Sequence, residues 1–210
     1  MSKALKTYLF YFLILVYVSG TIGFVLNPAF FRPFTPFTLM LTAYVFLIHQ
    51  PWKTSEYGLS FITLILIGFT VEIIGVNTGL IFGEYIYGQS MGFAVLGVPL
   101  VISLNWALLI ALGILISKYL SNNRWAASLI SALIITGTDF LMEQVCADLD
   151  FWQFESGIAG IHNYIAWFLI SLISSYVFFK PLSRGNKLMA LKILALQILF
   201  FGLNFLIKLF

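Results

Sequence analysis

The feature that most constrains the fold of this chain is a succession of apolar runs, most of them long enough to cross a lipid bilayer. A transmembrane helix needs about 20 predominantly apolar residues. Such runs occupy residues 7–26, 36–50, 58–80, 94–117, 125–146, 163–180 and 188–209. The second run is the weakest, because it is short and starts among prolines. We therefore predict an all-α fold, an integral membrane bundle of about seven transmembrane helices.

The scarcity of charge supports this fold class. Only 9% of the 210 residues are charged, whereas soluble domains average about 25%, and so few charges could not cover a soluble surface. No linker or low-complexity tract divides the chain, so we expect one transmembrane domain over residues 1–210. No basic cluster is dense enough to predict a nucleic-acid partner, and the expected surroundings are membrane lipids.

Lysine and arginine are distributed unevenly between the two sides of the predicted bundle. With the N-terminus in the cytoplasm, the inner side holds Lys3, Lys6, Lys53, Lys118, Arg124, Lys180, Arg184, Lys187 and Lys192. The outer side holds only Arg32 and Lys208, beside the acidic residues Glu84, Asp148, Asp150 and Glu155. Because cytoplasmic loops carry the excess of basic residues, we expect a multi-pass protein of the inner (cytoplasmic) membrane with its C-terminus outside.

A few polar side chains inside the predicted spans fall at similar depths. Charged groups in a span are costly and usually face the protein interior. At about 1.5 Å of rise per residue, the outer half of the bilayer contains Glu72, Asp139 and Glu143. Asn105 lies near the midplane and Asn163 at the outer start of the sixth span. The shared depth predicts one polar site, and the alternative is that these groups only form hydrogen bonds between helices.

The spacing of two of these acids suggests proton chemistry. Asp139 and Glu143 are four residues apart, so they share a helix face. Two carboxyl groups this close resist simultaneous ionisation, so we expect at least one to be neutral. A neutral carboxylic acid in an apolar pocket is a proton donor, and Glu72 is a second candidate for this role.

Glycines follow Glu72 at intervals of four, at Gly75, Gly79 and Gly83. They predict one smooth helix face that lets a neighbouring helix approach closely. The alternative is that Gly83 and Gly88 end the helix and turn the chain into an outer loop. Glu72 lies near the glycine face and is expected to point toward helix contacts rather than lipid.

Aromatic residues lie beside the polar set in sequence or in depth. We expect Tyr85 and Trp152 to belong to an interfacial aromatic belt. Trp106 and Trp167 lie deeper, where their rings could line a channel for a flat polyene or stabilise a carbocation.

Several kinds of site are not indicated. The single cysteine, Cys146, excludes an internal disulfide and a multi-cysteine metal site. His49 and His162 are expected on opposite sides of the membrane, where they could not jointly ligate one haem or metal ion. We see no phosphate-binding glycine loop and no Asp-rich magnesium motif, and we predict no metal and no cofactor.

Four segments together identify a family resemblance. They are residues 72–87 (EIIGVNTGLIFGEYIY), 98–100 (VPL) leading to Asn105-Trp106, 139–143 (DFLME), and 151–155 (FWQFE) followed by 163–168 (NYIAWF). In order and spacing they resemble the bacterial and archaeal carotenoid biosynthesis membrane family, whose characterised members are 1,2-hydratases of acyclic carotenoid end groups. The chain departs from the family pattern at Gln144, Phe154, Gly160 and His162.

The resemblance implies cofactor-independent addition of water to the terminal double bond of a lipophilic substrate of the lycopene or γ-carotene type, taken from the bilayer. On this hypothesis the catalytic residues are Asp139 as proton donor, Glu72 as the second candidate, and Glu143. The substrate-binding residues are Asn105, Trp106, Asn163, Trp167, Tyr85 and Tyr87. The alternatives are a carotenoid end-group cyclase or isomerase, a proton-coupled transporter, and a carotenoid- or lipid-binding protein without chemistry.

Overall fold

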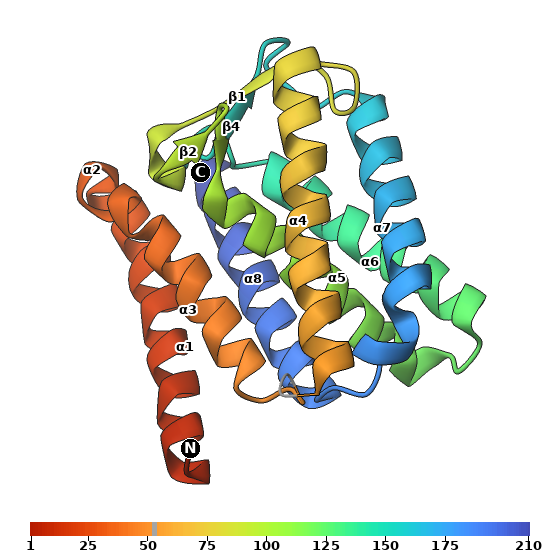
Figure 1. Ribbon diagram of the computed structural model, residues 1–210. Coiled ribbons are helices and arrows are strands. Elements are labelled where there is room, and N and C mark those ends of the chain that lie inside the picture. The colour runs from red at the N-terminus through yellow and green to blue at the C-terminus, as the bar shows by residue number, and fades with distance from the viewer. Residues whose placement is uncertain (52–53) are drawn as a thin grey trace.

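The computed structural model describes residues 1–51 and 54–210 and contains long helices that run side by side (Figure 1). Within these residues, seven helical segments are long and apolar enough to cross a membrane, as predicted. They are α1 (Lys3–Leu26), the segment 28–47 formed by α2 (Pro28–Phe31), η1 (Arg32–Phe34) and α3 (Thr35–Leu47), α4 (Ser55–Thr78), α5 (Leu100–Leu120), α6 (Arg124–Glu143), α7 (Ile161–Leu182) and α8 (Lys187–Lys208). The chain is therefore an all-α integral membrane bundle.

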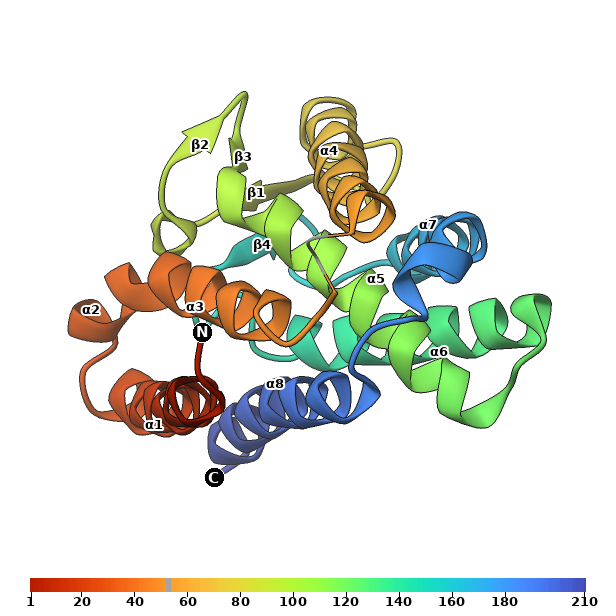
Figure 2. The same ribbon diagram turned by 60° about the horizontal axis from the view of Figure 1, so that its bottom comes forward.

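Helix α5 occupies the centre of this bundle. It contacts α3, α4, α6, α7 and α8, which surround it when the bundle is viewed obliquely from one end (Figure 2). Its sequence is apolar on all sides, as expected of a helix enclosed by others, and 78% of its most apolar window is buried. The outer helices instead expose leucine, isoleucine and phenylalanine side chains along their length, as lipid contact requires.

Small residues bring the central helices close together. A Cβ atom added to Gly113 of α5 would lie 2.4 Å from Ser131 Oγ of α6. Ser131 in turn shares a hydrogen bond of 2.8 Å with Ser175 Oγ of α7. Small residues and hydroxyl pairs of this kind are a common means of helix association in membranes.

One end of the bundle, which we call the strand end, carries four short strands within the described residues. They are β1 (Tyr85–Tyr87), β2 (Ala94–Val95), β3 (Val98–Pro99) and β4 (Trp152–Phe154), with the 3-10 helix η2 (Gln89–Met91) between β1 and β2. The sequence did not indicate these strands, and the predicted span 94–117 was placed too early. Residues 94–99 form the β2–β3 hairpin, since Gly97 adopts a positive φ of 81° at its turn, and α5 begins only after Pro99.

The two longer loops of the strand end are joined to each other. Strands β1 and β4 pair antiparallel, with Tyr85 opposite Phe154 and Tyr87 opposite Trp152. Asp150 Oδ2 accepts hydrogen bonds from the backbone N–H and the hydroxyl of Ser90, at 3.0 and 2.8 Å. These contacts link the loop after α4 to the loop after α6 and fix both above the bundle.

The glycine pattern after Glu72 ends the helix instead of extending it. Helix α4 stops at Thr78, and Gly79 caps it in the left-handed conformation with φ 66°, which glycine adopts without strain. The prediction of one smooth glycine face was wrong for Gly79 and Gly83, which lie outside the helix. The alternative placed the helix end too late, at Gly83 instead of Gly79. The expectation for Glu72 was right, because its side chain is buried within the bundle.

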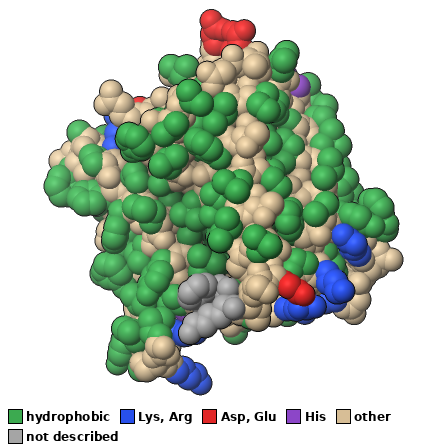
Figure 3. Space-filling model, in the orientation of Figure 1, with side chains coloured by type: hydrophobic (Ala, Val, Ile, Leu, Met, Phe, Trp, Pro, Cys, Tyr) green, Lys and Arg blue, Asp and Glu red, His purple; other side chains and the backbone are tan. Residues whose placement is uncertain are grey.

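Charged side chains separate toward the two ends of the bundle. Lysine and arginine gather at the end where the N-terminus lies, and acidic side chains form the tip of the strand end (Figure 3). The two basic residues predicted on the outer side lie at the strand end, where Lys208 forms an ion pair with Asp148 and Arg32 donates to the backbone carbonyl of Asp148. Lys53, one of the predicted inner cations, lies outside the described residues.

Candidate active site

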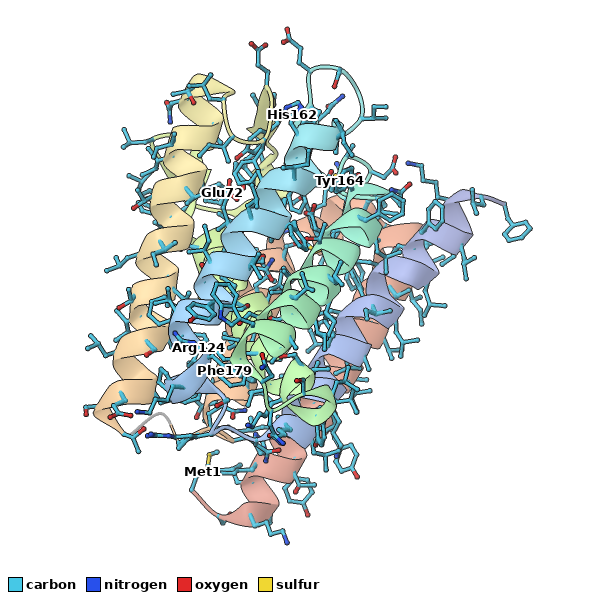
Figure 4. The ribbon with its side chains drawn as sticks, turned by 90° about the vertical axis from the view of Figure 1, so that its right-hand side faces the viewer. Met1, Glu72, Arg124, His162, Tyr164 and Phe179 are labelled. Atoms are coloured by element: carbon cyan, nitrogen blue, oxygen red, sulfur yellow. The ribbon has the colours of Figure 1, made fainter. Side chains whose placement is uncertain are left out.

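The predicted acids lie close to the strand end. Glu72 is six residues before the end of α4, and Asp139 is four residues before the end of α6, which places them about 9 and 6 Å from those helix ends. In Figure 4, Glu72 lies in the same half of the bundle as Tyr164 and His162 of α7, whereas Arg124, Phe179 and Met1 lie in the other half. The shared depth predicted for these groups is therefore present.

Glu72 is buried and accepts hydrogen bonds on both carboxyl oxygens. Its Oε2 atom accepts from the hydroxyls of Tyr85 at 2.5 Å and Tyr87 at 2.6 Å. Its Oε1 atom accepts from Trp106 Nε1 at 2.7 Å. Because an indole N–H can only donate, this arrangement suits an ionised carboxylate.

Glycines on the same face of α4 make room for these donors. A Cβ atom at Gly68 would lie 2.6 Å from Trp106 Cβ, and one at Gly75 would lie 2.7 Å from the Phe82 ring and 3.0 Å from the Tyr85 hydroxyl. Gly68, Glu72 and Gly75 stand at i, i+4 and i+7 of one helix, so they share a face. The glycines thus allow Trp106 and Tyr85 to reach the carboxylate between them.

Both tyrosines remain hydrogen-bond donors at physiological pH. Burial, reinforced by the neighbouring Glu72 carboxylate, raises the pKa of the Tyr85 hydroxyl well above its ordinary value. The pKa of the Tyr87 hydroxyl rises for the same two reasons. Tyr85 was predicted to lie in an interfacial belt, but it is only 7% exposed, because β1 folds back over the bundle.

Asp139 is fully buried and has a free carboxyl oxygen. Its Oδ2 atom accepts a hydrogen bond of 3.1 Å from Asn163 Nδ2 on α7. Its Oδ1 atom is buried and has no hydrogen-bond partner among the residues that the structure describes. An oxygen in this situation can carry a proton and present it to a ligand, and the amide of Asn163 fixes the orientation of the group.

Glu143, one turn further along α6, is held by the loop that follows it. Both of its carboxyl oxygens lie 3.1 Å from Trp152 Nε1, and Cys146 Sγ donates to Oε2 at 3.2 Å. Burial raises the pKa of the Cys146 thiol, which therefore stays protonated. Trp152, expected in the aromatic belt, is 6% exposed and forms part of the site instead.

These acids share one small cavity, which we call the acid cavity. It is lined by Glu72, Phe82, Tyr85, Tyr87, Ile102, Asp139, Glu143, Trp152, Phe154, Asn163 and Trp167. Its volume is about 20 Å³, and about 10–15 Å³ suffices for one water molecule when polar partners are present. In the described residues, no three His, Cys, Asp or Glu side chains are grouped so that they could hold a metal ion.

Two predicted tryptophans form one wall of the site. Trp106 and Trp167 stack face to face, with ring centroids 3.7 Å apart and an interplanar angle of 7°. Trp167 lines the acid cavity, while Trp106 lies behind it and is bound to Glu72. Of these two rings, Trp167 is therefore the one that can contact a ligand in the cavity.

Asn105 does not line the acid cavity. It lines a larger neighbouring space of about 330 Å³, which we call the apolar groove, between α1, the segment 28–39, α5 and α8. Because α5 begins at Leu100, Asn105 also lies nearer the strand end than the midplane depth predicted for it. Two residues, Ile102 and Trp152, line both the groove and the acid cavity.

Several residues of the site were not predicted. They lie in the loops of the strand end or in the first turn of α5. Ile102 precedes Asn105 by three residues, Phe82 follows the end of α4, and Phe154 lies on β4. The sequence did contain one signal for Trp152 and Phe154. Aromatic residues stand at alternate positions after Glu143, and alternate residues of a strand face the same side.

Comparison with known proteins agrees with the sequence motifs. A family model described as carotenoid biosynthesis protein matches residues 34–209. A bisanhydrobacterioruberin hydratase of Haloarcula japonica is 27% identical over 136 residues, which cover 61% of this chain and 46% of the relative. The chain thus spans about half the length of that relative. No solved structure matches.

Proposed function

Because the chain belongs to the carotenoid biosynthesis protein family, we propose that it is a hydratase that adds water to the terminal double bond of an acyclic carotenoid end group. The similar protein from Haloarcula japonica bears the name of a hydratase, which supports this reaction class. The substrate class that we propose is a carotenoid of the lycopene or γ-carotene type, which has at least one acyclic end and dissolves in the bilayer.

The observation that carries the proposal is the acid cavity. It joins three carboxyl side chains with a space for one water molecule, next to a larger apolar groove. Hydration of an isolated alkene needs a proton donor, a stabilised cation and one positioned water, and an apolar surrounding that excludes further water. The cavity offers a residue for each of these tasks.

In the proposed first step, Asp139 transfers the proton on Oδ1 to the terminal double bond. The π electrons form the new C–H bond, and a tertiary cation and the Asp139 carboxylate result. The face of Trp167 stabilises the cation through its ring electrons, and the carboxylate of Glu72 stabilises it by charge. Glu72 suits this role better than proton donation, since donors occupy both of its oxygens.

In the second step, the water molecule in the acid cavity attacks the cation and forms the C–O bond. Glu143 takes the released proton, so that the product is a neutral tertiary alcohol. Asp139 and Glu143 are one helical turn apart, and return of the proton from Glu143 to Asp139 restores the starting state. No redox change occurs, and the atoms of one water are gained.

The function predicts a defined change in pigment mass. We expect cells that produce lycopene to accumulate a carotenoid heavier by one water, or by two, when they express this chain. Chromatography with mass detection checks this, and cells with an empty vector are the control. If neither lycopene nor γ-carotene, supplied in this way, gains a water, or if they are converted only to isomers of equal mass, the hydratase proposal is wrong.

The same measurement separates the nearest alternative. A cyclase or isomerase would use the protonation step and exclude water, so its product would have the mass of the substrate. The space for one water beside Asp139 favours hydration. A proton-coupled transporter needs polar groups across the whole membrane, whereas the buried acids of the described residues lie toward the strand end.

For the orientation, we propose that the strand end faces outward and the N-terminus faces the cytoplasm. The support is the clustering of basic side chains at the N-terminal end (Figure 3), which cytoplasmic loops favour. The acid cavity would then lie in the outer half of the bilayer.

The orientation can be tested with single introduced cysteines, because the native Cys146 is 3% exposed and therefore shielded. We expect a membrane-impermeant maleimide to label Glu84→Cys in intact cells and to label Asn122→Cys only after the membrane is opened. Both positions are exposed, and the unchanged chain is the control. The reverse labelling pattern would show the opposite orientation.

A further inference from the structure

Building on the proposed function, we propose that the apolar groove binds one end of the polyene chain, which enters sideways from the bilayer between α1 and α3. Helices α1, α3 and α8 surround this side of the bundle (Figure 2). A volume of about 330 Å³ is at the small end of the range for ligand pockets. The groove thus accommodates one end of a long polyene, while the rest of the chain stays in lipid.

The walls of the groove change from lipid-facing to buried along its length. Toward the bilayer it is lined by exposed side chains such as Leu15 at 59% and Phe34 at 49%. Toward α5 it is lined by Asn105 and Trp152, at 3% and 6%. An apolar chain can therefore pass from the membrane into the protein without crossing water.

The inner end of the groove borders the reacting groups. Ile102 and Trp152 line the groove on one side and the acid cavity on the other. Trp152 also donates to Glu143, so its ring lies directly between the two spaces. A chain end that reaches these two side chains borders the acid cavity, which Asp139 lines.

The groove also contains polar atoms that suit the product. Thr35 and Gln197 are among the residues that line it. The side-chain oxygens Thr35 Oγ1 and Gln197 Oε1 are buried and have no hydrogen-bond partner among the described residues. Either can bind a hydroxyl group, which the substrate lacks and the tertiary alcohol carries. The groove can therefore accept the product as it leaves.

Gly20 of α1 offers a way to fill the groove. It lines the groove, and a Cβ atom there would meet Phe200 at an ordinary 3.6 Å, so larger side chains can extend into the space. We expect Gly20→Leu and Gly20→Phe to retain progressively less lycopene from mixed micelles, with at least about a tenfold weaker affinity for the second. Absorbance of the polyene per mole of purified full-length protein measures this, in an Asp139→Asn background that keeps the substrate unreacted.

The matched controls are Gly202→Leu and Gly202→Phe, because a Cβ atom at Gly202 on α8 meets nothing within 4 Å and this residue does not line the groove. They should bind lycopene like the parent. If the Gly20 variants do not fold, Ser19→Phe at the exposed mouth of the groove replaces them and should also weaken binding.

The outcomes separate this inference from the hydratase proposal. If folded Gly20 variants bind lycopene like the parent, the proposal that the groove binds the polyene is wrong, even if the unchanged chain hydrates lycopene. If the Gly20 variants lose bound lycopene but the unchanged chain never forms the alcohol, the proposed binding groove is supported and the proposed hydratase activity is wrong. A parent protein that retains no lycopene would overturn the groove assignment.

Discussion

We expect Asp139→Asn to lower the rate of carotenoid hydration by about 10²–10⁴-fold, the usual contribution of general acid catalysis. Asparagine has almost the shape of aspartate, and its side-chain oxygen can still accept from Asn163 Nδ2, which lies 3.1 Å from the present carboxyl oxygen. The atom at the Oδ1 position would become an amide nitrogen, which cannot donate a proton to a carbon. Initial rates of alcohol formation in membranes from expressing cells, measured by mass, check this.

Asp148→Asn is the matched control for this variant. Asp148 lies on the strand end with an exposed side chain that pairs with Lys208, outside the acid cavity. We expect it to hydrate at the parental rate. If Asp139→Asn also kept that rate, with its protein level unchanged, Asp139 would not be the proton donor.

The sequence predicts the helices well because the apolar runs, apart from the short second one, are long and are bounded by polar or turn residues. Asn123 and Asn186 accept hydrogen bonds from the first turns of α6 and α8, as N-cap residues do. The ends that were misplaced depend on local backbone conformation. The left-handed Gly79 ends α4, and the β2–β3 turn delays α5.

The depth of the acids could also be predicted, but not the neighbours of every polar residue. The depths of Glu72 and Asp139 follow from their distances along the chain to the end of a helix. Asn105 lies on α5, which is buried on nearly all sides, so the hydrophobic period does not show which space a given residue faces. This is why it was expected beside the acids and lies in the groove.

Trp152 and Cys146 were missed for a different reason. Their contacts with Glu143 depend on the loop after α6 folding over its own helix and pairing with β1, more than 60 residues earlier in the chain. Register between distant strands is set by tertiary packing, since three-residue strands carry too little pattern to specify it. Tyr85 and Trp152 were therefore expected in an interfacial belt.

The hydrogen bonds of Glu72 lead to a further prediction, that its two possible neutral replacements behave differently. In Glu72→Gln the remaining oxygen can accept from Trp106 Nε1, and the amide can donate to the hydroxyls of Tyr85 and Tyr87, which are able to accept. The fold should survive, while the lost charge slows hydration about 10²-fold. Glu72→Leu would leave these buried donors unpaired, at about 1–3 kcal/mol each.

We therefore expect Glu72→Leu, but not Glu72→Gln, to lower the thermal unfolding temperature of the detergent-solubilised protein by several degrees or more, since an unpaired buried donor is among the costly effects of single substitutions. Glu84→Gln and Glu84→Leu are the matched controls, because Glu84 is an exposed acid in the loop that follows α4. Equal unfolding temperatures for Glu72→Leu and the parent would show that the donors find other partners. Parental hydration by Glu72→Gln would show that the charge of Glu72 does not act on the cation, and would leave Asp139, Glu143 and Trp167 as the residues that act on the substrate.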